Sequence, residues 1–337
     1  MSTNKEQVIA YILKLIAASD KKLVSKTVEA FSGDVSKSSV YNYLAELSSA
    51  GIVKKNGSSY FLVDESFSFV YCNDGSLGED RIFSKDIEPI LHGYEKNVFS
   101  AWRYAFTEMM NNAIEHSSAE KISVLVKKNA LRTTVEIADN GVGIFRNIEN
   151  YMRNERSEEL SLKECASLLF SGKFTTASSM HSGEGIFFTS HLMDSFHIFS
   201  DGIIFTRNNF SDTTTPAKAN EGTVVVMSLD NRSNKTAREV FDRFSNVDDG
   251  FIKTQIPIAQ VFSGSGPVSR SEARRLGELV SKFLDVELDF FGVEEVGQGF
   301  VHEMFIVWQN RNPNVKITVL NAEEAVDRMI RRVMNTK

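Results

Sequence analysis

Apolar residues recur at helical spacing at the start of the chain, and they predict a first helix over residues 5–18. A short second helix is predicted from Leu23 to Phe31, and Ser36 is placed to cap a third. The buried stripe of this third helix is expected to comprise Val40, Tyr43, Leu44 and Leu47. Residues 52–63 then read as a hairpin around Asn56-Gly57, a favoured two-residue turn. Residues 1–75 are therefore predicted to form three helices and a β-hairpin.

A longer helical stripe begins at Phe99 and continues to Ile114, and two alternating segments follow it. Residues 121–128 and 131–139 are predicted to pair as strands across a short turn at Asn129-Ala130. Pro89 and Gly93 break the connector before the helix. We expect these elements to belong to a second domain spanning residues 76–232.

Strands and helices alternate over the last hundred residues. A charged helix over residues 233–250 leads into strand-like segments at 251–263, 285–293 and 316–321. Helical segments separate these strands, and a helix over residues 323–334 follows the last of them. This alternation predicts an α/β layer with parallel strand pairing over residues 233–337. The fold class expected for the whole chain is therefore multidomain α/β.

Charge is distributed unevenly along the 337 residues. The net charge is −6, yet residues 1–63 carry eight lysines and five acidic residues, a net of +3 that leaves −9 for the remainder. A basic head on an acidic body suggests that any nucleic-acid contact is made by the N-terminal part, although an excess this small is also compatible with ordinary surface charge.

The cysteines and the N-terminus bear on localisation. Cys72 and Cys165 lack metal-ligand or redox spacing, which fits a reducing compartment. The first residues form an amphipathic pattern rather than a signal peptide, and no run of eighteen apolar residues occurs. We expect a cytoplasmic, bacterial-type protein with no membrane contact.

The candidate chemistry lies on the long helix and directly after the second strand. Glu108, Asn112 and Glu115 share one helix face, which by itself would favour a solvated surface. The strand that ends at residue 139 leads into Asp139-Asn140-Gly141-Val142-Gly143. An acid, an amide and a glycine turn together are the parts that a nucleotide site needs.

This combination resembles the GHKL superfamily of ATPases, which includes gyrase-type ATPases, histidine kinases and anti-sigma-factor serine kinases. Glu108 and Asn112 match the family's N box, and Asp139, Gly141 and Gly143 match its first glycine box. The resemblance implies a Bergerat α/β sandwich that binds ATP and Mg²⁺. It also implies that Asp139 accepts a hydrogen bond from the adenine amino group, that Asn112 coordinates Mg²⁺ and that Glu108 acts as general base.

Later segments resemble the remaining boxes of the family. Gly183 and Gly185 match the second glycine box, and Gly222-Thr223 resembles the third. The resemblance makes Lys173, Thr175 and Thr176 candidate phosphate contacts on the ATP lid and makes Thr223 a partner of the adenine-binding acid. His92, His116, His191 and His197 have no partner at metal-ligand spacing, and we expect them to be structural or surface residues.

The N-terminal pattern resembles the winged helix-turn-helix family of DNA-binding domains. In that family the third helix enters the major groove. The resemblance implies that double-stranded DNA is contacted by Lys37, Ser38, Ser39, Tyr41 and Asn42 on the helix, and by Lys54 and Lys55 on the wing. A winged helix that makes only protein contacts is the alternative.

Residues 286–305 resemble a STAS domain, the fold of anti-sigma-factor antagonists. Where antagonists carry a phosphorylated serine, this chain has Gly297-Gln298-Gly299, so the phosphorylation cycle does not transfer. His302 and Glu303 are expected to be surface residues. We expect a docking or regulatory module that contacts a protein partner.

Three functions remain open. The first is an ATP-binding transcriptional regulator whose DNA or partner binding is switched by Mg-ATP or its slow hydrolysis. The second is an anti-sigma-type serine/threonine kinase acting on a separate protein. The third is an interaction scaffold that does not hydrolyse ATP. A classical histidine kinase is disfavoured, because no dimerisation segment with a phospho-accepting histidine precedes the ATPase part. A homodimer is compatible with each.

Overall fold

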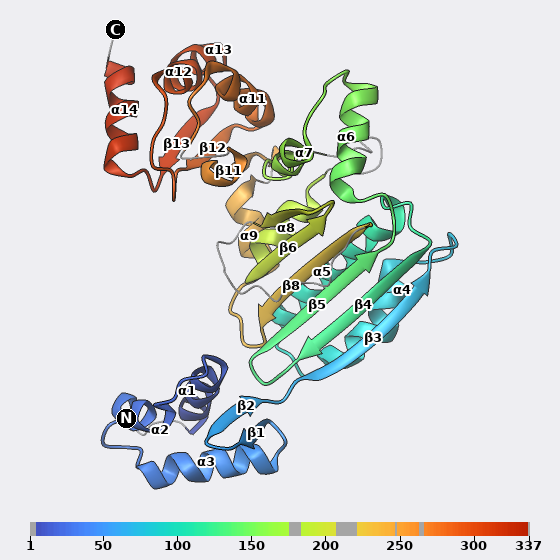
Figure 1. Cartoon of the computed structure of the whole chain (residues 1–337), viewed down its shortest axis with the longest axis vertical. Coiled ribbons are helices and arrows are strands. Elements are labelled where there is room, and N and C mark those ends of the chain that lie inside the picture. Colours follow the sequence, from blue (N-terminus) through green and yellow to red (C-terminus); the bar gives the residue numbers. More distant parts are fainter. Residues whose placement is uncertain (1–4, 175–182, 207–220, 247, 263–265, 336–337) are drawn as a thin grey trace.

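The computed structural model describes residues 5–174, 183–206, 221–246, 248–262 and 266–335 (Figure 1). Residues 5–62, the head, contain α1 (Lys5–Ala17), α2 (Leu23–Ala30), α3 (Lys37–Ser49), β1 (Val53–Asn56) and β2 (Ser59–Leu62). The Ser39 N–H donates to Ser36 Oγ at 3.1 Å, so the predicted cap of the third helix is confirmed. The predicted apolar stripes of α1 and α3 form a core of their own, which includes Val8, Ile12, Val40, Leu44 and Leu47.

A six-stranded antiparallel sheet forms the centre of the molecule, with strand order β3-β4-β5-β8-β6-β7 in the described part of the chain. Its strands are β3 (Glu65–Cys72), β4 (Lys121–Lys128), β5 (Arg132–Asp139), β6 (Ser195–Ser200), β7 (Ile203–Thr206) and β8 (Thr223–Asp230). The predicted pairing of residues 121–128 with 131–139 is confirmed as the β4–β5 hairpin. Strand β3 corrects the predicted boundary at residue 75, because residues 65–72 pair with β4 over their whole length.

Helices cover one face of this sheet, and α5 (Lys96–Glu115) is the longest of those described (Figure 1). Its apolar stripe is buried from Val98 to Ala113 and includes Trp102 and Phe106, both fully buried. The other helical segments of the central domain are α4 (Glu79–Ile82), η1 (Phe83–Ile87), η2 (Glu88–Leu91), α6 (Ile144–Glu155), α7 (Leu162–Leu168) and α8 (Gly185–Leu192). Burial of this stripe against the sheet fixes which face of α5 remains open to a ligand.

Helix α9 (Ala237–Phe244) also packs on the central domain, which differs from the predicted boundary at residue 232. The Phe241 ring lies 5.3 Å from the Tyr104 ring of α5 and 4.3 Å from the Phe188 ring of α8, measured between centroids. A small β9 (Ser245–Asn246) and β10 (Gly250–Phe251) pair then connects to the C-terminal part.

The C-terminal module has a three-stranded parallel sheet in the order β11-β12-β13, which confirms the predicted parallel pairing. Its elements are β11 (Lys253–Pro257), α10 (Ile258–Val261), α11 (Arg270–Val280), β12 (Asp285–Asp289), α12 (Gln298–His302), η3 (Glu303–Trp308), α13 (Gln309–Arg311), β13 (Lys316–Leu320) and α14 (Glu324–Asn335). None of the helices in the described ranges combines the length and apolar character needed to cross a membrane.

The head contacts the central domain at the turn between β4 and β5. Ala130 and Leu131 in this turn pack against the apolar core of the head. The Asn129 side-chain amide donates to Asp64 Oδ1 at 2.8 Å, just before β3 begins. Figure 1 shows the head at the end of the sheet where this turn lies.

Candidate functional site

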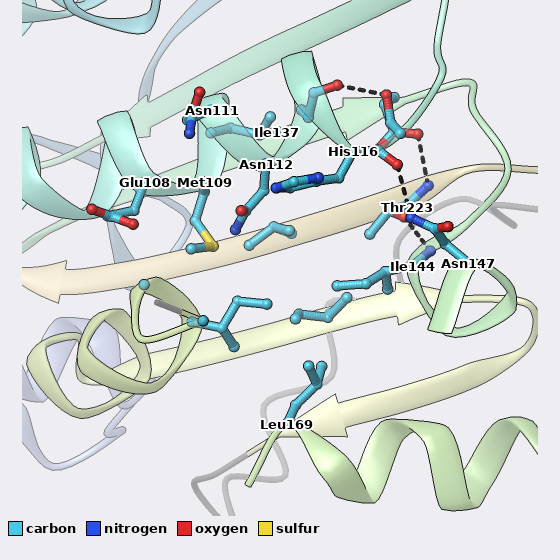
Figure 2. A pocket seen from close by; sticks show the side chains of 18 of the residues that line it. Glu108, Met109, Asn111, Asn112, His116, Ile137, Ile144, Asn147, Leu169 and Thr223 are labelled. Carbon is cyan, nitrogen blue, oxygen red and sulfur yellow. Dashed lines mark hydrogen bonds between the residues drawn. The ribbon is translucent and has the colours of Figure 1, made fainter. Parts of the chain in front are cut away.

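A cavity of about 300 Å³ opens beside α5, and we call it the α5 cavity. Glu108 and Asn112, one helical turn apart, both line it, and Figure 2 shows their side chains along the same side of the helix. Glu115, the third polar residue of the predicted face, is exposed and does not line the cavity. The remaining walls come from β5, β6, β8, α6, the segment after α7 and the start of α8. Segments from both halves of the central domain therefore converge on the acid and amide of α5.

Asp139 ends β5 and faces this cavity. Its Oδ1 accepts the N–H of Gly141 at 2.8 Å and the N–H of Thr223 at 3.3 Å. In the described part of the chain, Oδ2 accepts no hydrogen bond, so one carboxylate oxygen is anchored and the other is left for a ligand. Burial raises the pKa of Asp139, while the two N–H bonds act in the opposite direction.

Thr223 is the first residue of β8, and its hydrogen bonds connect this strand to the end of β5 and the start of α6. Its Oγ1 accepts the N–H of Ile144 at 3.0 Å, and its own N–H donates to Asp139. Thr223 lines the cavity and is largely buried. The predicted association of Thr223 with Asp139 is therefore present as a backbone hydrogen bond.

The glycine turn allows a close backbone approach at Gly141. A Cβ at this position would overlap the carbonyl oxygen of Ser117, which already accepts the Val142 N–H at 2.9 Å. Gly143 follows with a φ of 92° and precedes α6. The turn is thus packed against the C-terminal end of α5, which holds Asp139 beside the helix that carries Asn112.

The second glycine pair lies at the start of α8, where Gly183 and Gly185 both line the cavity. A Cβ on Gly185 would overlap Glu108 Oε2. The absence of a side chain at Gly185 therefore lets α8 approach the Glu108 carboxylate directly.

Lys173 is not brought to this cavity, in contrast to the prediction of a phosphate contact. Its ammonium donates to the carbonyl oxygen of Lys282 at 3.2 Å and lies 4.6 Å from the centroid of the Phe283 ring. Burial lowers the pKa of Lys173. The C-terminal module supplies these partners, so the Lys173 ammonium lies against that module and not in the α5 cavity. Thr175 and Thr176, the other predicted lid contacts, lie outside the described residues.

Five further polar residues line the cavity and were not predicted as ligand contacts: Asn111, His116, Ser117, Asn147 and Glu184. His116 was expected to be structural or on the surface. The Asn147 side-chain amide donates to the His116 carbonyl oxygen at 3.1 Å and ties α6 to the end of α5. The spacing of four residues between Asn112 and His116 was the available signal, since it places both on one helix face.

All but one of the residues predicted to contact DNA are exposed on the head. Lys37, Ser38, Tyr41 and Asn42 are exposed on α3, and Tyr41 is 56% exposed. Lys54 and Lys55 are exposed on β1. Ser39 is half-buried, and its N–H is used by the helix cap.

The C-terminal module shows Gly297 directly before α12, with no hydroxyl in Gly297-Gln298-Gly299. Glu303 was expected on the surface, yet it is 5% exposed. Its Oε1 accepts Arg274 Nε at 2.8 Å, and this bond lowers the pKa of Glu303. Glu303 therefore ties η3 to α11 within the module.

Two family models match separate parts of the chain. Residues 89–229 match the histidine kinase-like ATPase domain, and residues 272–327 match a STAS-like domain of unknown function. Among curated proteins, none matches the chain. The two matches support the resemblances stated for the middle and C-terminal parts and fit an ATP-binding regulatory protein. They leave residues 1–88 unmatched, so the winged helix stays an expectation.

Proposed function

We propose that the α5 cavity binds Mg-ATP, with the adenine amino group donating to Asp139 Oδ2. This proposal rests on the different roles of the two carboxylate oxygens of Asp139. Oδ1 is held by the N–H groups of Gly141 and Thr223, and Oδ2 has no partner among the described residues. Asp139 lines the cavity, so Oδ2 can accept an N–H from a ligand there while Oδ1 keeps its two backbone donors.

The phosphates would lie toward Glu108 and Asn112. Mg²⁺ favours oxygen ligands and usually takes one or two from the protein and the rest from phosphates and water. Asn112 Oδ1 is such a ligand. In the described ranges, no group of three His, Cys, Asp or Glu side chains could hold a metal without the nucleotide. The donor set of the cavity therefore fits an ion that arrives with ATP.

We assign to Glu108 the role of accepting a proton from the attacking group. It lies on α5 one turn before Asn112, and its carboxylate lies against Gly185 at the start of α8. A carboxylate in this position can orient and deprotonate water as a general base.

We further propose that nucleotide binding switches the DNA affinity of the head. Both strands that carry adenine-site residues reach the head contact at their other end. Asp139 and Thr223 lie at one end of the β5–β8 ladder, and the Arg132–Asp230 pair lies at the other. There the Asn231 N–H donates to the Leu131 carbonyl oxygen at 2.8 Å, and Leu131 packs against the core of the head.

Such a switch requires that ATP bind two arrangements of the protein with different affinity. The test is the affinity for mixed-sequence double-stranded DNA at low salt, measured by fluorescence anisotropy with and without Mg-ATP. We expect a change in affinity, and by linkage the same fold-change in ATP affinity when DNA is present. Lys37→Ala should weaken DNA binding, whereas Lys14→Ala on α1 is the matched control. Equal DNA affinity with and without Mg-ATP would contradict the switch.

A further inference from the structure

A second cavity, of about 400 Å³, lies between the central domain and the C-terminal module, and we call it the interdomain cavity. Its walls are α6 and α7 on one side and α11 on the other. Ligand sites occur preferentially at domain interfaces and have volumes of roughly 300–1,000 Å³. We propose that this cavity binds a small, largely apolar molecule that carries one anionic group.

The apolar character follows from the lining. Eight of the lining side chains are aliphatic or aromatic: Met152, Leu160, Leu168, Phe174, Val261, Phe262, Leu276 and Leu279. Two lining serines, one on α7 and one just after it, already donate their hydroxyl hydrogens to backbone carbonyl oxygens. Ser167 Oγ donates to the Lys163 carbonyl oxygen at 3.0 Å, and Ser171 Oγ donates to the Leu168 carbonyl oxygen at 2.9 Å. Most of a ligand's surface would therefore meet apolar groups, which favours an apolar body.

The side chains that line the cavity include four cations and three acids. Glu164 and Arg275 form an ion pair, and Glu164 Oε2 also accepts the Ser161 N–H. The exposed rim carries two further cations, Arg156 and Lys282, and two further acids, Glu158 and Glu278.

Lys173 is the remaining charge. It is half-buried and forms no ion pair with any described residue, so the lining has a net charge of one positive unit.

The surroundings of Lys173 favour an anion beside it. Its ammonium has three donors, and the one hydrogen bond recorded in the described structure goes to the Lys282 carbonyl oxygen. It lies over the faces of Phe283 and Phe251, at 4.6 Å and 5.4 Å from their centroids. Burial lowers the pKa of Lys173, and the Glu184 carboxylate opposes this effect from outside the interdomain cavity. An anion bound in the cavity would stabilise the charged form further. One carboxylate, sulfonate or phosphate monoanion satisfies both the charge and the spare donors.

The interdomain cavity is separate from the α5 cavity but adjacent to it. Phe174, next to Lys173, lines both cavities. Lys173 lines the interdomain cavity and does not line the α5 cavity. The two sites can therefore be tested independently.

The test uses a matched pair of fluorescent probes on the full chain without nucleotide. Anilinonaphthalene sulfonate has an apolar body and one anionic group, and N-phenylnaphthylamine has a closely similar body without the charge. We expect saturable binding of one sulfonate probe per chain, and a preference for it over the neutral probe of roughly tenfold or more. Lys173→Met should abolish this preference and retain binding of the neutral probe. Lys316→Met should behave as wild type, since the Lys316 side chain is exposed on β13 and does not line the cavity.

A second variant protects the test against a folding defect in Lys173→Met. Leu279→Trp fills the cavity from the side of α11, and it should weaken both probes by a similar factor while the melting temperature remains close to that of wild type. Sulfonate binding that is unchanged in both variants, or non-saturable in wild type, would overturn the proposal. Because no ATP is present, these outcomes do not depend on the nucleotide site.

Discussion

Asp139 carries a charge that costs the folded protein stability. Burial raises the pKa of its carboxyl above the ordinary value of 3.8, so the folded protein holds this proton more tightly than the unfolded chain does. The contribution of Asp139 to the free energy of unfolding therefore falls as pH rises from 3.8 through the raised pKa. Asp139→Asn removes this dependence.

The stability difference between Asp139→Asn and wild type should consequently increase in favour of the variant across that pH range. Urea unfolding along a pH series measures it. A difference that is constant with pH, or that decreases as pH rises, would show that burial does not control this carboxyl.

Glu108 should affect hydrolysis much more than binding. Glu108→Gln keeps the shape of the side chain and removes the base, so phosphate release should fall by roughly 10²–10⁴-fold while Mg-ATP still binds. Glu115→Gln is the matched control, since Glu115 is exposed on the same helix outside the cavity. Phosphate release that is equal in Glu108→Gln and Glu115→Gln would exclude the general-base role.

At the residue scale, the sequence predicted the groups whose neighbours are near in the chain. Glu108 and Asn112 share a helix face, and Asp139 binds the N–H of Gly141 two residues later. The contacts of Lys173 were not predicted because its partners, Lys282 and Phe283, are about a hundred residues away in another module. The local sequence pattern does not indicate which of two domains a side chain will contact.

At the element scale, α5 and the β4–β5 hairpin were predicted from periodicity alone, since each has a continuous buried stripe. The connector over residues 64–98 was expected to contain a strand or two, but the pairing of β3 with β4 was not predicted. Strand β4 begins about fifty residues after β3, and pairing across such a distance depends on the fold of the intervening helices. The packing of α9 on the central domain was not predicted for the same reason. Its contacts are with aromatic rings on α5 and α8, which are distant in sequence.

The approach of α8 to α5 gives a prediction for Gly185. A Cβ there would displace the Glu108 carboxylate, so Gly185→Ala should reduce phosphate release by about tenfold or more. The melting temperature should change little, because alanine favours the first turn of a helix. Gly78→Ala is the control, because a Cβ at Gly78 meets nothing within 4 Å. If Gly185→Ala hydrolyses ATP as Gly78→Ala does, α8 does not position Glu108.

For the whole molecule, the β4–β5 turn is the contact through which the head and the nucleotide site would communicate. Leu131→Ala removes an apolar contact with the core of the head and leaves the cavity unchanged. The effect of Mg-ATP on DNA affinity should shrink in this variant, while Mg-ATP affinity without DNA stays at the wild-type value. Leu125→Ala, on β4 and outside the head contact, is the control. A full Mg-ATP effect in Leu131→Ala would place the coupling elsewhere.

The central claim is that Asp139 reads the adenine base, and calorimetric titration of Mg-ATP into wild type and Asp139→Asn tests it most directly. The asparagine keeps the shape of the side chain and replaces an anionic acceptor, so affinity should fall by roughly tenfold or more. Asp80→Asn, whose exposed side chain lies 3.4 Å from Arg103, should bind as wild type does. Equal Mg-ATP affinity in wild type and Asp139→Asn, or no binding to wild type, would contradict the account.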